Sequence, residues 1–191
     1  MERLIASARE AGIAELDLEV LEQNSHAARI YEALGFRDVR KLDVWVREPA
    51  PLAPDGLPKG GPGGPPAELA VADCLELHAR YHASRRPWQR DLDSLRHWSP
   101  RLSAAGERDA RGVLGWVIYR LNANRLNLAD LAVRPGESVL PVTRALARLI
   151  ARHPDTTTML VNLPEGDPLA ASIAAVGASV RLRQREMSLR L

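Results

Sequence analysis

The sequence predicts a mixed α/β fold, in which a twisted sheet of parallel and antiparallel strands is flanked by helices. Residues 16–20 alternate apolar and acidic side chains, the period of two expected of a strand with one buried face. Residues 27–34 instead place apolar side chains at i, i+3, i+4 and i+7, which is the stripe of an amphipathic helix. Because both patterns recur along the chain, we expect helices packed on a sheet.

Four elements are expected in the first 48 residues. The patterns predict, in order, a helix over residues 1–11, a strand over 15–21, a helix over 24–34 and a strand over 41–46. A segment of this size with two strands is close to the lower limit for an independent core. We therefore expect its strands to join a larger sheet, within the chain or across a homodimer.

The second of these helices carries signals at both ends. Asn24 or Ser25 can cap its first turn through a side-chain oxygen. Gly35 lies where a left-handed C-terminal cap is wanted, and Phe36 can fold back on the last turn.

A proline- and glycine-rich stretch follows, with seven prolines and five glycines from Pro49 to Pro66, which predicts an extended linker. Beyond it the patterns predict, in order, helices over residues 69–82 and 88–98, strands over 113–121 and 125–133, a helix over 142–150, a strand over 156–163, a short helix ending at Gly177 and a strand over 180–191. The alternation changes phase within residues 125–133, which predicts a β-bulge near Ala129 or Asp130.

The spacing Asn-x-x-Ala-x-x-x-Tyr-x-x-x-Gly-Phe, from Asn24 through Ala27 and Tyr31 to Gly35 and Phe36, resembles the acetyl-CoA-binding segment of the GNAT superfamily of N-acyltransferases. The resemblance implies that Asn24 and Ala27 contact acetyl-CoA, the cosubstrate, and that Tyr31 is the general acid. The acceptor would be a small-molecule or peptide amine. A phenol, with an ordinary pKa of about 10, keeps its proton at neutral pH and can give it to a leaving thiolate. Taken singly, Asn24 is equally well a helix cap and Tyr31 a residue of the apolar stripe.

The chain also repeats itself. Residues 3–6 and 148–151 both read Arg-Leu-Ile-Ala, and Leu34-Gly35-Phe36 aligns with Val176-Gly177-Ala178. With the resemblance, this repeat predicts three parts: the C-terminal half of a first GNAT repeat at residues 1–48, a linker at 49–67, and a second, degenerate GNAT-like domain at 68–191. In the family, front strands and a glycine-rich turn that holds the diphosphate precede the first of these helices. We therefore expect an incomplete chain of a tandem enzyme.

The second copy has lost the residues that carry the chemistry in the first. In the alignment Asn24 falls on Gly166 and Tyr31 on Ile173. Where the family has its glycine-rich turn, Pro141 has no N–H to offer a diphosphate, and Glu137 brings a charge of the wrong sign.

Composition excludes several other classes of protein. The net charge of +2 over 191 residues gives no nucleic-acid footprint, and no long apolar stretch or secretory signal indicates a membrane or an export route. We expect a cytoplasmic protein.

Cys74 has no disulfide partner, and the pair His78 and His82 lacks an acidic companion on its helix face, so no metal is expected. Two functions stay open, an acyl-CoA-dependent N-acyltransferase and a non-catalytic interaction or structural module derived from one.

Overall fold

The structure, a computed structural model, describes residues 1–52 and 67–191 of the chain; residues 53–66, most of the predicted linker, lie outside the described residues. The described helices are α1 (Glu2–Glu10), α2 (Ser25–Ala33), α3 (Val71–Tyr81), α4 (Leu92–Trp98), α5 (Leu140–Arg152) and α6 (Ala170–Ala175). The described strands are β1 (Glu15–Leu21), β2 (Arg37–Arg47), β3 (Ala67–Leu69), β4 (Ser103–Asp109), β5 (Gly112–Asn122), β6 (Arg125–Val133), β7 (Thr157–Pro164) and β8 (Ser179–Arg190). Within these ranges no helix has both the length and the apolar character needed to cross a membrane.

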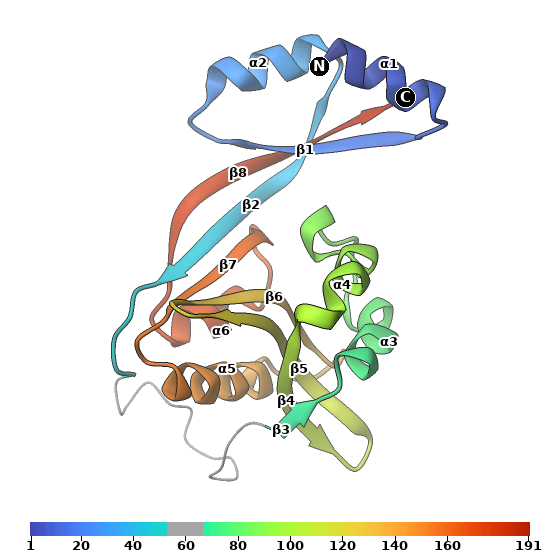
Figure 1. Cartoon of the computed structure of the whole chain (residues 1–191). Helices are drawn as coiled ribbons and strands as arrows, with labels where there is room; N and C mark the ends of the chain where they lie inside the picture. Colours follow the sequence, from blue (N-terminus) through green and yellow to red (C-terminus); the bar gives the residue numbers. More distant parts are fainter. Residues whose placement is uncertain (53–66) are drawn as a thin grey trace.

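The strands form one eight-stranded sheet in the order β1-β8-β2-β7-β6-β5-β4-β3 (Figure 1). Strands β6 and β7 are parallel, and every other neighbouring pair is antiparallel. Mixed sheets of this kind need helices on their faces. The predicted α/β class, a mixed sheet flanked by helices, is confirmed.

Two segments of the chain have the same element order and exchange their last strands. The first segment runs α1-β1-α2-β2, and the second runs α5-β7-α6-β8. Strand β8 lies between β1 and β2, and β2 lies between β8 and β7, so each last strand pairs with the first strand of the other segment. Figure 1 shows β2 and β8 as a long ribbon that connects the α1–α2 part with the rest. The strands of residues 1–48 thus join a larger sheet within the chain.

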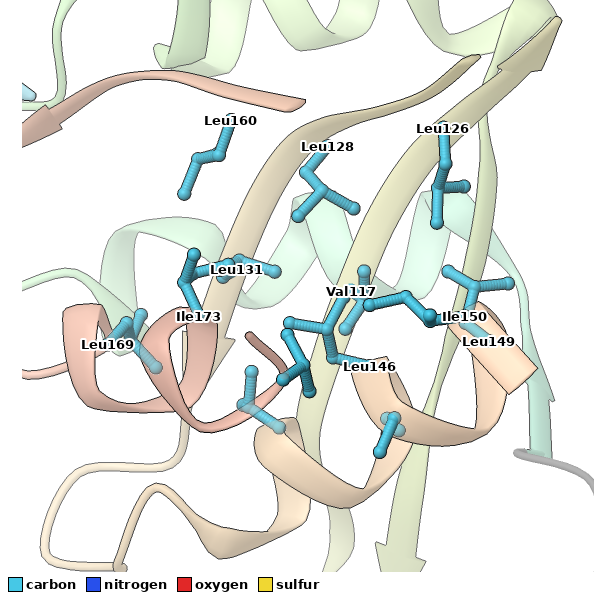
Figure 2. Close-up of a cluster of buried hydrophobic side chains, with 14 of the residues drawn as sticks. Val117, Leu126, Leu128, Leu131, Leu146, Leu149, Ile150, Leu160, Leu169 and Ile173 are labelled. Atoms are coloured by element: carbon cyan, nitrogen blue, oxygen red, sulfur yellow. The ribbon is translucent and has the colours of Figure 1, made fainter. Parts of the chain in front are cut away.

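Three apolar clusters hold the helices against the sheet. The largest packs α5 and α6 on one face through residues such as Val117, Leu131, Leu146 and Ile150, which are fully buried (Figure 2). On the other face, Trp116 and Ile118 of β5 contact α3 and α4 instead, because successive side chains of a strand point to opposite faces. A third cluster joins α1 and α2 to β1 and β8.

The ends of α2 are set by local residues. The Asn24 side-chain oxygen accepts the Ala27 N–H at 3.1 Å, so Asn24 rather than Ser25 is the cap. Gly35 has φ +99°, and the buried Phe36 returns its N–H to the Tyr31 carbonyl at 3.0 Å. Helix α6 ends in the same way at Gly177, whose φ is +85°.

The structure differs from the sequence predictions in several elements. Strands β3 and β4 were not expected, because both are short and their apolar side chains are mostly alanine. The predicted helix over residues 88–98 is instead a 3-10 turn at Trp88–Arg90 followed by α4, which begins where the Asp91 side chain accepts the Ser94 N–H. The predicted bulge is confirmed at Ala129, since Ile118 pairs with Asp130 and Tyr119 with Leu128.

Candidate functional site

The three site residues predicted from the sequence all lie on or next to helix α2. Asn24 and Ala27 meet at the first turn through the capping hydrogen bond of 3.1 Å, in which the side-chain amide oxygen (Oδ1) of Asn24 accepts the Ala27 N–H. Tyr31 lies one turn further along, partly buried, and packs edge-on against Phe36 with ring centroids 5.9 Å apart. No described residue accepts a hydrogen bond from the Tyr31 hydroxyl, and the side chain is held by the packing of its ring.

Helix α2 covers β1, whose outer edge pairs with no described strand. The Glu22 N–H donates to the Arg183 carbonyl, and the Leu191 N–H donates to the Ala14 carbonyl. In this register the backbone N–H and C=O groups of the even-numbered residues of β1 point toward β8. The amides of Asp17 and Glu19 therefore point to the free edge. An unpaired edge of this length is a surface on which a further strand can add.

Glu19 is a carboxyl group that the sequence did not single out. It lies at the junction of β1, β7 and the 3-10 turn, where it accepts hydrogen bonds from Trp88 Nε1 at 2.9 Å and Asn162 Nδ2 at 3.2 Å. Burial raises the pKa of Glu19, and the neighbouring Glu186 adds to the rise. From the sequence, Glu19 would be placed on the solvent-facing side of an alternating strand. The 3-10 turn that covers it lies about 70 residues further along the chain, so no neighbouring residue indicates its burial.

Strands β6 and β7 separate partway along their length. Their parallel pairing ends at Leu128 and Leu160, next to the bulge at Ala129 and close to Asn162, which has φ +56° in β7. A parallel pair that opens in this way leaves space between the two strands for side chains or a ligand.

Side chains from the segment between α3 and α4 occupy this opening. Gln89 hydrogen-bonds Asn162 of β7, and Arg90, only 1% exposed, pairs with Asp130 of β6 at 3.3 Å. Arg86 pairs with Asp167 at 2.7 Å just beyond β7. The chain itself thus bridges the two separated strands.

Asp130 is the centre of this polar cluster. Its carboxylate accepts hydrogen bonds from His82 Nε2 at 3.0 Å and Trp116 Nε1 at 2.9 Å, besides the Arg90 contact. Burial opposes ionisation of Asp130, but His82, Arg90 and Arg86 outweigh it and hold its pKa well below the ordinary value. Strand β6 therefore supplies, through Asp130, the acidic residue that the sequence of α3 does not place next to His78 and His82.

The turn before α5 does not present free positive charge. Arg134 is held by both oxygens of Asp109, at 2.7 and 2.8 Å, and Glu137 pairs with Arg111 at 2.5 Å. Pro141 is buried in the first turn of α5. These residues line or adjoin an open depression of about 520 Å³ at the end of β6, whose arginines are largely neutralised by carboxylates.

Comparison with solved structures places this architecture in a known fold. The chain is similar to a GCN5-related N-acetyltransferase from Sphaerobacter thermophilus (18% identity, TM-score 0.62, 99% of this chain and 65% of that one). It is also similar to a GCN5-related N-acetyltransferase from Kribbella flavida (14% identity, TM-score 0.64, 98% and 73%) and to a tandem GNAT protein from the clavulanic acid biosynthesis pathway (16% identity, TM-score 0.65, 97% and 66%).

The fold is that of the GCN5-related N-acetyltransferases. The chain spans about two thirds of the length of the Sphaerobacter and clavulanic acid pathway proteins. No protein-family model matches the sequence, and no curated protein matches it either.

Proposed function

We propose that this chain is part of an acyl-CoA-dependent N-acyltransferase, an enzyme that moves an acetyl group from acetyl-CoA to an amine. The observation that carries the proposal is helix α2 of a GCN5-related fold, which Asn24 caps and which packs Tyr31 against the edge strand β1, with no hydrogen-bond partner for the Tyr31 hydroxyl among the described residues. The amide of Asn24 and the first turn at Ala27 would contact the pantetheine arm. Acetyl-CoA supplies a thioester whose sulfur becomes a leaving group.

Tyr31 has the position and chemistry to protonate that sulfur. Its ring packs against Phe36 and its hydroxyl bonds to none of the described residues, so it can donate its proton without breaking a hydrogen bond to them. An amine nucleophile must also lose a proton. Glu19 is suited to be the general base that accepts this proton, because among the described residues it is the carboxyl group whose pKa is raised.

The first segment acts, in this proposal, as the C-terminal half of a first GNAT repeat in a tandem protein. Helix α5 buries eight residues against β4, β5 and β6, whereas its counterpart α1 buries two, Ile5 and Ala8. Leu4 is 56% exposed and Ile30 46% exposed on the same part of the molecule. Helix α1 buries few residues, and the outer edge of β1 is unpaired among the described strands. Both features suit the docking of the N-terminal half of the first repeat, with one of its strands parallel to β1.

The second domain is proposed to be structural. Its strand opening is filled by Gln89 and Arg90, and the turn before α5 has Pro141 and Glu137 where a diphosphate would need N–H groups and positive charge. These two features also favour the alternative function, a non-catalytic interaction module. Under either function, we expect the chain by itself to bind acetyl-CoA weakly or not at all.

Tyr31→Phe tests the enzymatic proposal, in a form of the protein whose first repeat is completed. We expect acetyl transfer to fall by about a hundred- to ten-thousand-fold, the range for loss of a general acid. Tyr119→Phe, on the distant strand β5, is the matched control and should leave turnover unchanged. Undiminished transfer in Tyr31→Phe would remove Tyr31 from the mechanism. A completed protein that neither binds acetyl-CoA in calorimetry nor transfers acetyl to amines would support the non-catalytic module.

A further inference from the structure

A cluster of metal-ligating side chains lies under helix α3, away from α2 and Tyr31. His78 lies in the last turn of α3 and His82 caps its C-terminal end, and their ring centroids are 4.3 Å apart. The bulge at Ala129 brings Asp130 of β6 beneath them. One ligand atom from each of these three residues lies within 4.8 Å of the other two.

The separations suit a small cation after modest adjustment. His82 Nε2 and Asp130 Oδ2 are 3.0 Å apart, close to the spacing of two ligands on one ion with bonds of about 2.0–2.2 Å. His78 is the member that has to move toward them. His78 belongs to the last turn of α3, His82 is the residue that caps the C-terminal end of this helix, and Asp130 belongs to the paired strand β6, so the fold brings the three residues together.

His78 has an unsatisfied ring nitrogen. The residue is 6% exposed, and its Nε2 atom has no hydrogen-bond partner in the described part of the chain. Leaving a polar atom buried without a partner costs free energy, and native structures rarely keep one without a reason. A metal ion between His78 and Asp130 would satisfy this nitrogen.

We propose that His78, His82 and Asp130 bind one divalent transition-metal ion of the zinc type. Two imidazoles and a carboxylate are ligands that such ions prefer, and three protein ligands leave a fourth position for water. Trp116 Nε1 donates to Asp130 Oδ2 at 2.9 Å and Arg90 contacts Oδ1, so outer groups already orient the carboxylate.

Cys74, one turn before His78, lies outside this group, because among the described residues the ligand atoms within 4.8 Å of one another belong to His78, His82 and Asp130.

Two arginines limit the affinity. Arg86 and Arg90 lie around the cluster and repel a second positive charge, although Asp167 neutralises Arg86 and one Asp130 oxygen is shared with Arg90. We therefore expect weaker binding than at a closed structural site with four thiolate or imidazole ligands.

The test uses the full chain, stripped with EDTA and dialysed, and titrated with Zn²⁺ in a calorimeter and with Co²⁺ under visible spectroscopy. We expect one ion per chain and d–d bands from nitrogen and oxygen ligands. His78→Leu should bind at least tenfold more weakly, with circular dichroism as the check that it stays folded, since the His78 ring also has a hydrogen bond to the Arg90 backbone. His82→Gln keeps a donor for Asp130 and should weaken binding similarly.

His97→Gln, at an exposed histidine of α4, is the matched control and should bind as the wild type does. X-ray absorption at the zinc edge should show a shell of nitrogen and oxygen that includes imidazole. Absence of stoichiometric binding by the wild type, equal binding by His78→Leu, or a sulfur ligand at the zinc would each overturn the proposed site.

Discussion

Asp130→Asn is expected to lower the stability of the fold strongly. The substitution keeps the size of the side chain but removes the charge that Arg90, 1% exposed, pairs with inside the sheet. Removing one member of a buried ion pair leaves the other charge uncompensated and costs about 3–5 kcal/mol. For a chain of this length each kcal/mol corresponds to about 2–4 °C, so the melting temperature should fall by roughly 6–20 °C.

Urea denaturation and calorimetry in EDTA measure this loss, and pH gives a second check. The pKa of Asp130 is lower in the folded state than the ordinary value of about 3.9, so its ionised form stabilises the fold above about pH 4. That stabilisation is lost as the pH falls toward the folded pKa. The difference in free energy of unfolding between wild type and variant should therefore be large above about pH 4 and narrow in stronger acid.

A double variant separates the ion pair from simple packing. Asp130→Leu combined with Arg90→Met replaces both charges with apolar groups and should recover much of the lost stability, because neither charge is then left alone. If Asp130→Asn costs less than about 1 kcal/mol at pH 7, or if the difference does not narrow in acid, the ion pair is not what holds β6 to the 3-10 turn.

Three further experiments test other parts of the molecule. Gly35→Ala should cost about 1–3 kcal/mol in urea denaturation, since φ is +99° and the added Cβ would lie 3.2 Å from Leu189; Gly12→Ala, also at positive φ but with open space, should cost less. In hydrogen exchange, β1 amides bonded to β8 should be slow and those on the free edge fast; slow exchange on both sides would reveal a strand from a second copy. In a completed protein, Glu19→Gln should lower acetyl transfer and flatten its rise with pH, whereas Glu15→Gln should do neither.

Local patterns in the sequence predicted the elements that local chemistry controls. Asn24 can cap α2 because its side chain reaches an N–H three residues away, and Gly35 ends the helix because glycine tolerates positive φ. The bulge at Ala129 was visible as a change of phase in an alternating strand. Short or alanine-rich strands such as β3 and β4 carry too little apolar contrast to be recognised this way.

The sequence by itself determined the α/β class, the order of most elements and the residues of the α2 segment, because each depends on neighbours within one or two turns. Only the tertiary structure decided that β2 and β8 exchange places, that Asp130 lies beneath His78 and His82, and that Arg90 fills the opening between β6 and β7. The physical reason is distance along the chain. Asp130 and His82 are 48 residues apart, and no periodicity in either segment records that the fold will bring them to 3.0 Å.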